Sequence, residues 1–196
     1  MTVLERPLSG LPPEALALLG DLGRQAGTIL EYGAGGSTVE LADLGEGRLF
    51  SVETSAAWAA ELRAWFAAHP TRRSVVVHHV DVGPVGRWGF PLGHAAWDRF
   101  HHYPTSVWDR HDFVHPDLVV IDGRFRLACF LTTALRIERP VTVLWDDYRD
   151  RREYHAAERY ARPTKMAGRT ALFRLEPQIL RPSDLSWVLD AFTRPR

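Results

Sequence analysis

The sequence predicts a three-layer, doubly wound α/β protein, in which a mostly parallel sheet lies between two layers of helices. Three observations support this prediction. Short β-branched runs alternate with helical patterns along most of the chain, which is typical of consecutive strand–helix–strand units. A glycine-rich turn over residues 33–36 separates the first of these runs from the next helix. Acidic residues end successive strands, and parallel strands bring such residues to one edge of the sheet.

Length and composition set the limits of the prediction. The chain has 196 residues, of which 45% are apolar, and this suits one domain over residues 1–196 with a substantial core. The single cysteine, Cys129, excludes a disulfide framework and a multi-cysteine zinc site. The 24 basic and 24 acidic residues balance, which argues against nucleic acid as the default partner. The chain lacks an apolar run of roughly 18 residues and a signal-peptide pattern, so we expect a cytoplasmic protein without a membrane span.

Local patterns define the elements of the first half of the chain. Residues 12 and 13 are prolines and precede apolar residues at helical spacing, which predicts a helix over about 12–26. The S-T-V-E motif at 37–40 has the spacing of a capping box, so a helix is expected directly after the glycines. An alanine-rich segment predicts a helix over 55–68. Apolar and β-branched runs predict strands at 28–32, 48–53 and 74–81.

The second half continues the alternation after one interruption. Strands are expected at 117–122 and 141–146, and helices at about 125–137 and 149–161. Segments 164–167 and 170–176 are expected to close the sheet as a hairpin, and Ser183 to cap a last short helix. The interruption, residues 82–116, is rich in glycine, proline and aromatic residues. A loop of this length is usually a binding loop or a lid, so we expect a lid-like insertion whose aromatic rings stack on a flat acceptor.

The turn over residues 33–36 is the strongest local sign of a ligand. Glycine lets the backbone turn sharply and approach a ligand, and the N–H groups at a helix start attract negative charge. The dinucleotide fingerprint G-x-G-x-x-G is incomplete, because Thr38 stands at its sixth position. Glu31 lies two residues before the first glycine and suits a ligand with an ammonium group. Glu53 ends the next strand, where a carboxylate can accept from both ribose hydroxyls, and Asp81 ends the third strand near an adenine edge.

With these residues identified, the sequence resembles the class I S-adenosylmethionine-dependent methyltransferases over roughly residues 25–176. The resemblance implies a seven-stranded sheet with an antiparallel last strand. It also implies that the first acid and the glycines hold the methionine part of the cofactor, the second acid its ribose and the third its adenine. The doubled Gly35-Gly36, where many members have G-x-G, leaves open which glycine lies under the cofactor. The implied cofactor contacts are Glu31, Tyr32, Gly33, Gly35, Gly36, Ser37, Glu53 and Asp81.

Three further acids follow the fourth and fifth strands. Asp122 is expected beside the transferred methyl group, and Asp146-Asp147 end the next strand. Converging carboxylates can hold Mg²⁺ or Ca²⁺, and the pattern looks like that of the catechol-type O-methyltransferases, which place an acid after strand four and an Asp-Asn pair after strand five. Asp147 departs from that pair, so the metal site stays open. In the alternative interpretation, Asp122 caps the following helix and Asp146 pairs with an arginine.

Methyl transfer is an in-line displacement, so alignment and exclusion of water supply most of the catalysis. A hydroxyl acceptor must also lose a proton, for which Asp122, Asp147 and His101 are the candidates. Arg124 and Arg126 lie in the first turn of a helix, where they oppose its macrodipole. They are expected either to face a carboxylate, that of Asp122 or of an anionic substrate, or to be solvated.

The sequence therefore predicts transfer of a methyl group from S-adenosylmethionine to a small molecule with a hydroxyl group, whose character is anionic or aromatic. Three alternatives stay open: an NAD-dependent oxidoreductase, a module of the same fold that binds cofactor without turnover, and an RNA methyltransferase. The last would use the basic segment 149–181, which holds nine basic and four acidic residues. Whether the chain forms a homo-oligomer is also left open.

Overall fold

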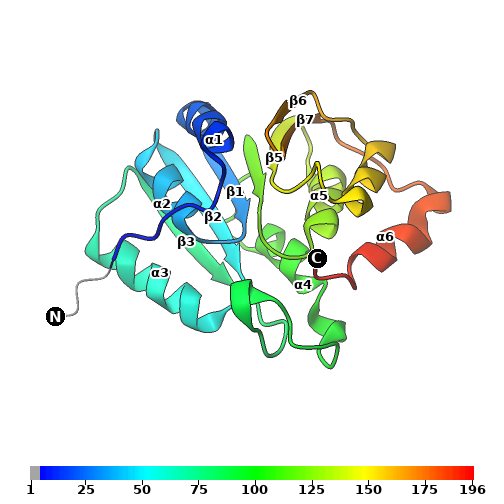
Figure 1. Cartoon of the computed structure of the whole chain (residues 1–196), viewed down its shortest axis with the longest axis horizontal. Coiled ribbons are helices and arrows are strands. Elements are labelled where there is room, and N and C mark those ends of the chain that lie inside the picture. The colour runs from blue at the N-terminus through cyan, green and yellow to red at the C-terminus, as the bar shows by residue number, and fades with distance from the viewer. Residues whose placement is uncertain (1–4) are drawn as a thin grey trace.

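The computed structural model describes residues 5–196. Within them, seven strands form one sheet in the order β3-β2-β1-β4-β5-β7-β6 (Figure 1). Strand β7 runs antiparallel to both of its neighbours, and the other strand pairs are parallel. The predicted seven-stranded sheet with an antiparallel last strand is thus confirmed. The strands are β1 (Thr28–Tyr32), β2 (Gly47–Glu53), β3 (Arg73–His79), β4 (Leu118–Ile121), β5 (Val141–Trp145), β6 (Lys165–Ala167) and β7 (Thr170–Leu175).

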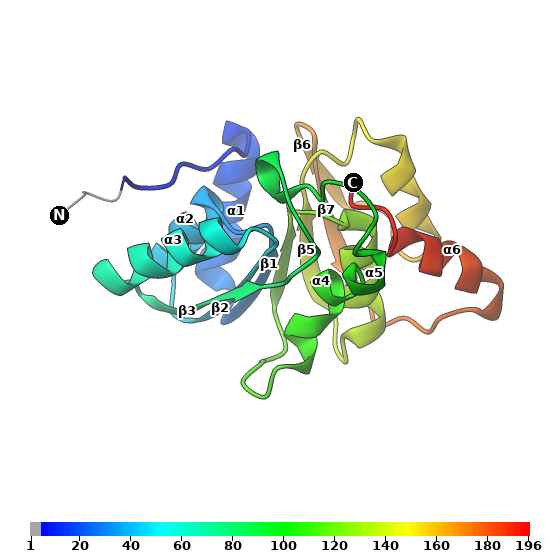
Figure 2. The same ribbon diagram turned by 90° about the horizontal axis from the view of Figure 1, so that it is seen from below.

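Helices cover both faces of the sheet. Helices α1, α2 and α3 lie on one face and α4, α5 and α6 on the other (Figures 1 and 2). Each face has its own apolar core, because alternate residues of the central strands point to opposite sides. The α-helices are α1 (Pro13–Gln25), α2 (Gly36–Asp43), α3 (Ala56–Ala68), α4 (His102–Thr105), α5 (Arg126–Arg136) and α6 (Leu185–Ala191). The 3₁₀ helices are η1 (Arg87–Gly89), η2 (Trp97–Arg99), η3 (Ser106–Asp109), η4 (Arg152–Arg159) and η5 (Pro182–Asp184).

Two predicted helices differ from the structure. The helix expected over 149–161 is the shorter 3₁₀ helix η4, whose buried residues Tyr154 and Ala157 are three positions apart. That spacing matches the three-residue turn of a 3₁₀ helix, which brings both side chains to the core. Ser183 does not cap the last helix; it lies inside η5, which leads directly into α6. Pro182 at the first position of η5 favours this early turn.

The insertion predicted as a lid has two parts with different environments. Its first part, around η1 and η2, exposes large apolar side chains: Trp88, Leu92 and Trp97. Its second part, from Phe100 to Trp108, is packed into the core beside α5. A buried hydrogen-bond chain anchors this part, because Trp108 Nε1 donates to the hydroxyl of Tyr32, which donates to the carbonyl of Pro104, both at 2.7 Å.

Two arginines secure the outer strands of the sheet. Arg73, at the start of β3, is buried and donates to the carbonyl oxygens of Gly23, Ala26, Gly27, Leu44 and Glu46 at 2.6–3.1 Å. It thereby joins the end of α1 to the turn before β2. Arg63 of α3 donates from Nε and Nη2 to the carbonyl of Val77 in the edge strand β3. Among residues 5–196, none of the helices has the length and apolarity needed to cross a bilayer.

Candidate functional site

The glycine turn brings the ends of β1 and β4 into direct contact. Gly33 has φ +105°, and a Cβ there would lie 2.5 Å from the backbone nitrogen of Gly123. A Cβ at Gly123 would in turn overlap the hydroxyl of Tyr103, which comes from the insertion. Both positions therefore require glycine, Gly33 for its backbone conformation and both for close packing. Sequence reasoning identified Gly33, included Tyr103 only among the aromatic rings of the insertion, and assigned no role to Gly123.

Gly35 and Gly36, the doubled glycine of the turn, have different surroundings, which separate their roles. A Cβ at Gly36 would overlap the backbone of Leu8 and Ser9, so Gly36 allows the N-terminal segment to cross the start of α2. A Cβ at Gly35 would meet nothing within 4 Å. Of the two, Gly35 is therefore the glycine whose backbone a ligand can approach. On the other side of the turn, Trp58 Nε1 of α3 donates to the carbonyl of Ala34 at 2.8 Å.

Glu31 is fully buried beneath the turn. The hydroxyls of Ser37, Thr38 and Ser51 all donate to its carboxylate at 2.6 Å. Burial raises the pKa of Glu31 to about 7, although these hydrogen bonds act to lower it. The carboxylate thus holds the start of α2 against β1 and β2, and the predicted contact with an ammonium group stays a prediction. The Tyr32 side chain points into the core on the α5 face, as its hydrogen bonds to the insertion show.

Glu53 presents one anchored and one available carboxylate oxygen at the end of β2. Its Oε1 accepts from the backbone N–H groups of Thr54 and Ser55 at 2.8 and 2.7 Å. Among residues 5–196, no group donates a hydrogen bond to Oε2. Burial raises the pKa of Glu53, against the lowering effect of these backbone N–H groups. The insertion lies directly against this site, because Thr54 Oγ1 donates to the carbonyl of Gly89 at 2.8 Å.

Asp81 and His101 lie at the margin of the site. Asp81 is two residues beyond the end of β3, is exposed, pairs with Arg99 of η2 and accepts from the N–H of Gly83 at 2.8 Å. It therefore fixes the start of the insertion in this structure. His101 is exposed just before α4, and its ring lies 4.1 Å from that of His102. Within the described chain, the side chain of His101 forms no hydrogen bond or ion pair with another predicted site residue.

The three acids after β4 and β5 do converge, but arginines separate them. Arg126 is buried and lies 3.0 Å from Asp122 and 3.3 Å from Asp147. Arg169 pairs with both Asp146 and Asp147, at 2.8 and 2.9 Å. Within residues 5–196 no group of three acidic, histidine or cysteine side chains is arranged to hold a metal ion. The guanidinium groups take the positions in which a cation would balance these charges, so the predicted metal site does not fit the residues present.

The pKa values of Asp122 and Asp146, two of the three aspartates in this cluster, are shifted in opposite directions. Burial raises the pKa of Asp122 to about 6, against the lowering effect of Arg126. Burial acts in the same direction on Asp146, but its hydrogen bonds with Arg169 and Thr170 hold its pKa below the ordinary value. Asp122 is therefore the carboxylate of the cluster that exchanges a proton near neutral pH, and its side chain is 27% exposed.

Backbone strain is concentrated around this edge of the sheet. Within residues 5–196, the non-glycine residues with positive φ are Trp88, Phe125 and Asp147, at 60°, 51° and 58°. They follow β3, β4 and β5 respectively, the last two within a few residues of the strand ends. Such conformations cost about 1–3 kcal/mol each and occur most often at functional sites. The strain marks the same edge as the acids and the glycine turn.

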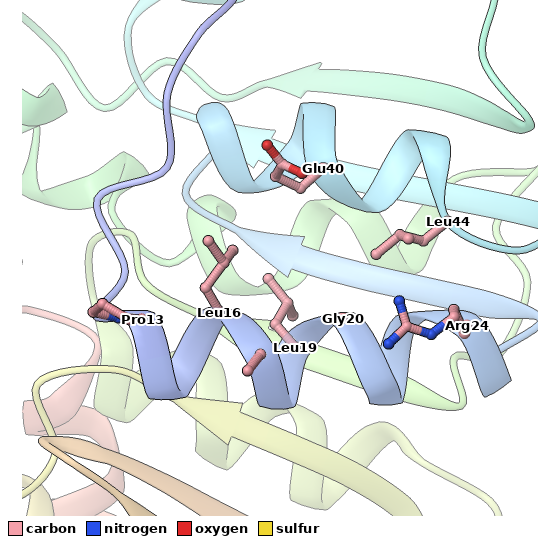
Figure 3. A pocket seen from close by; sticks show the side chains of 8 residues that line it. Pro13, Leu16, Leu19, Gly20, Arg24, Glu40 and Leu44 are labelled. Atoms are coloured by element: carbon pink, nitrogen blue, oxygen red, sulfur yellow. The ribbon is translucent and has the colours of Figure 1, made fainter.

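Two surface grooves lie elsewhere. One, of about 380 Å³, runs between α1 and α2, and the side chain of Leu16 extends from α1 toward α2 in Figure 3. The other is lined by residues of the N-terminal segment and of α3, including Trp58 and Trp65. Neither groove shares a residue with the predicted site.

Comparison with solved structures gives the family. A methyltransferase-like protein from Silicibacter pomeroyi is 43% identical, with a TM-score of 0.92 over 97% of this chain and 99% of that chain. The O-methyltransferase TomG from Streptomyces achromogenes, solved in complex with SAM, is 20% identical, with a TM-score of 0.54 over 85% of this chain and 79% of that chain. The O-methyltransferase from Bacillus cereus, solved in complex with SAH, is 18% identical, with a TM-score of 0.50 over 86% and 82%. Comparison with protein-family models and with curated proteins found no match.

The strand order and the helices on both faces define a Rossmann-like methyltransferase fold. Because the relative from Silicibacter pomeroyi is 43% identical over nearly the whole of both chains, this chain belongs to the same family of methyltransferase-like proteins. The resemblance stated from the sequence is thereby confirmed. The two O-methyltransferases share the fold at their lower identity.

Proposed function

We propose that this protein transfers a methyl group from S-adenosylmethionine to the hydroxyl group of a small molecule. The observation that carries the proposal is the pairing of an approachable backbone at Gly35 with an available carboxylate oxygen on Glu53. These two positions suit the methionine and ribose parts of the cofactor, respectively. The cofactor, when bound, supplies the activated methyl group, and the remaining steps fall to the residues of this chain.

Asp122 is the group that we propose to take the proton of the acceptor hydroxyl. It follows β4, its side chain is partly exposed, and its pKa of about 6 leaves it ionised near neutral pH. Asp147 is held by Arg126, Arg151 and Arg169, so its charge is already neutralised. His101 stays the alternative base. The proposal assigns no step to a metal ion.

The aromatic insertion would exclude water from the reaction. Thr54 ties η1 to the end of β2, and Tyr103 reaches the contact between Gly33 and Gly123. Alignment of acceptor and methyl group in a dry site supplies most of the rate enhancement in an in-line displacement. Glu31 acts through the turn that it positions, and Asp81 through its hold on the insertion.

An RNA substrate is less well supported by the charges of the basic segment 149–181. Several of its arginines form ion pairs within the protein, with Asp146, Asp147, Glu158 and Asp184. Arginines paired in this way have less charge to offer to phosphates. A small-molecule acceptor, anionic or aromatic, is therefore the substrate class that we propose.

Isothermal titration calorimetry with S-adenosylmethionine, S-adenosylhomocysteine and NAD tests the proposal. We expect the first two to bind the wild-type chain and NAD not to bind. Glu53→Gln should weaken S-adenosylhomocysteine at least about tenfold, because the ribose loses charge-assisted hydrogen bonds. Glu61→Gln, on the exposed side of α3, is the matched control. Tight binding of NAD without either methionine compound would identify an oxidoreductase instead.

Methylation of a panel of hydroxylated small molecules then separates an enzyme from a silent cofactor-binding module. Transfer of labelled methyl to any member supports the proposal. Cofactor binding without transfer to any compound or to RNA would favour the module.

A further inference from the structure

Arg124 carries a charge that no ion pair among residues 5–196 neutralises. Arg126, two residues later, pairs with Asp122 and Asp147. Arg124, in contrast, has no ion pair with a carboxylate of residues 5–196, and its buried Nε lacks a hydrogen-bond partner. Burial, followed by repulsion from Arg126, lowers its pKa. Asp122 and Glu53 attract its charge from a distance but form no ion pair with it. A partly buried guanidinium without a directly paired carboxylate is costly, and an anionic ligand would reduce that cost.

A second unsatisfied polar group, the hydroxyl of Tyr154, is influenced by the charge of the same arginine. The side chain of Tyr154, from η4, is almost fully buried, and its hydroxyl has no hydrogen-bond partner in the described chain. Burial raises the pKa of Tyr154, and the charges of Arg126, Arg151 and Arg124, in that order, act to lower it. A carboxylate or phosphate group can accept from a guanidinium and a hydroxyl together. Buried polar groups of native proteins are nearly always satisfied, so an unsatisfied guanidinium nitrogen and an unsatisfied hydroxyl whose charges influence each other point to a ligand.

The elements around Arg124 indicate which ligand supplies the anion. The guanidinium carbon lies 5.9 Å from the ring centre of Phe90 in the insertion, and the backbone N–H of Arg124 faces the hydroxyl of Tyr103 at 3.4 Å. Phe90 and Tyr103 come from the insertion, which also borders Glu53, and Tyr154 comes from η4, which follows β5, the neighbour of β4 on the side away from β1 and β2. The proposed methionine and ribose contacts lie instead at the ends of β1 and β2.

We propose that Arg124 and Tyr154 form an anion subsite for the methyl acceptor, so that the acceptor carries a carboxylate or phosphate group in addition to its hydroxyl. This inference rests on the proposed function and narrows its substrate class. Arg124 would fix the acceptor by its charge while Phe90 covers the guanidinium. Asp122, on the same loop, then faces the acceptor hydroxyl rather than its anionic group, because like charges repel.

NMR of the arginine Nε–Hε signals tests the subsite in the full-length chain. The Arg124 signal is identified by its loss in Arg124→Gln, and Arg152, which is exposed and unpaired within residues 5–196, serves as the internal control. The chain is titrated with benzoate and with inorganic phosphate, in the presence and absence of S-adenosylhomocysteine. We expect a saturable shift of the Arg124 signal at concentrations that leave Arg152 unchanged. If the Arg124 signal shifts only at anion concentrations that also shift the Arg152 signal, the proposal is overturned.

Variants separate the acceptor from the cofactor as the source of the anion. Arg124→Gln should weaken benzoate or phosphate at least about tenfold and Tyr154→Phe severalfold, while Arg152→Gln has no effect. Tyr154→Phe should not destabilise the fold, because the hydroxyl that it removes has no partner in the described chain. S-adenosylhomocysteine and 5′-methylthioadenosine, which lacks the amino-acid part, should bind all variants as they bind the wild type. Selective loss of S-adenosylhomocysteine in Arg124→Gln would place the cofactor's own carboxylate at Arg124 and refute the assignment. Failure of S-adenosylhomocysteine to bind the wild type would instead refute the proposed function, whatever the anions do.

Discussion

Three acids at the ends of β1, β2 and β4 differ in their burial and in which of their oxygen atoms are available to a ligand. Both carboxylate oxygens of Glu31 accept hydrogen bonds from hydroxyls. Glu53 has one oxygen anchored to the backbone, and Asp122 faces Arg126 while part of its side chain reaches solvent. Residue type and position are therefore not enough to assign a role. The neighbours decide whether a carboxylate shapes the backbone, accepts from a ligand or exchanges a proton.

Glu31 should make stability fall as the pH rises toward neutrality. Its pKa is about 7 in the fold against 4.5 as the ordinary value, so the folded state holds the proton more tightly. The resulting stabilisation is complete below about pH 4.5 and is lost through about pH 7. It amounts to on the order of 3 kcal/mol for one fully buried group. Urea unfolding from pH 5 to 8 should show this decline in the wild type and a smaller one in Glu31→Gln. An equal decline in both chains would contradict the prediction.

Protonation of Asp122 should lower kcat on the acidic side of the pH–rate profile. A general base works only when deprotonated, so kcat should rise as the pH passes about 6 and then become constant. Asp122→Asn should remove this rise and lower kcat by roughly 10²–10⁴-fold. Steady-state kinetics across pH provides the measurement, with S-adenosylhomocysteine affinity as the control for folding. If the rise persists in Asp122→Asn, another group, such as His101, is the base.

Sequence reasoning found the acids but not their partners. Strand ends and residue type identified Glu31 and Glu53, because both follow directly from local pattern. Their partners come from other elements. Ser51 of β2 donates a hydrogen bond to Glu31, and Tyr154 of η4 influences the pKa of Arg124. A single sequence has no local pattern for such neighbours.

At the scale of elements, the glycine turn and the insertion each consist of two parts with different structural roles. The absence of a Cβ at Gly36 makes room for the N-terminal segment, whereas the space beside the Cα of Gly35 is empty. The insertion is likewise divided, since one part exposes Trp88 and Trp97 and the other packs Phe100 into the core. Its length and composition predicted a binding loop, but not that half of it belongs to the core. That distinction depends on burial against α5, which no local pattern encodes.

The two adjacent glycines should respond oppositely to alanine. Gly36→Ala should destabilise the fold by roughly 1–3 kcal/mol, because its Cβ would overlap the backbone of the N-terminal segment. Gly35→Ala should leave stability nearly unchanged but weaken S-adenosylhomocysteine, because its Cβ would project into open space beside the proposed ligand. Thermal unfolding and calorimetry on the same two variants measure both effects. Normal cofactor affinity in Gly35→Ala would show that the ligand does not approach this backbone.

At the scale of the whole molecule, zero net charge conceals a dense internal pairing of acids with arginines. The cluster around Arg126 and Arg169 joins the ends of β4 and β5 to the start of β7. The order of elements and the class of fold were predictable, because alternation of strands and helices is a local signal. The pair between Arg126 and Asp122, four residues apart, was one of the expected alternatives. The arginine partners of Asp146 and Asp147 across the cluster were not predictable, because Arg169 and Arg126 are distant from them along the chain.

Arg73 should contribute strongly to global stability. Arg73→Met would leave five carbonyl acceptors without their donor in a buried position. We expect a loss of at least about 2 kcal/mol in the free energy of unfolding. Its exposed neighbour offers a matched control, since Arg72→Met should change stability by less than about 0.5 kcal/mol. Urea denaturation of both variants measures the difference, and similar values for the two would contradict this account of the Arg73 contacts.

The hydrogen bonds from Arg63 to the carbonyl of Val77 have a consequence for behaviour in a crowded solution. An unpaired edge strand is a template on which other chains can aggregate. Strand β6, at one end of the sheet, has three residues, and β3, at the other end, has this backbone acceptor occupied by a guanidinium. Arg63 therefore helps to protect the edge strand β3 from pairing with another chain. Removing it would raise the risk of intermolecular β-pairing even where the fold itself survives.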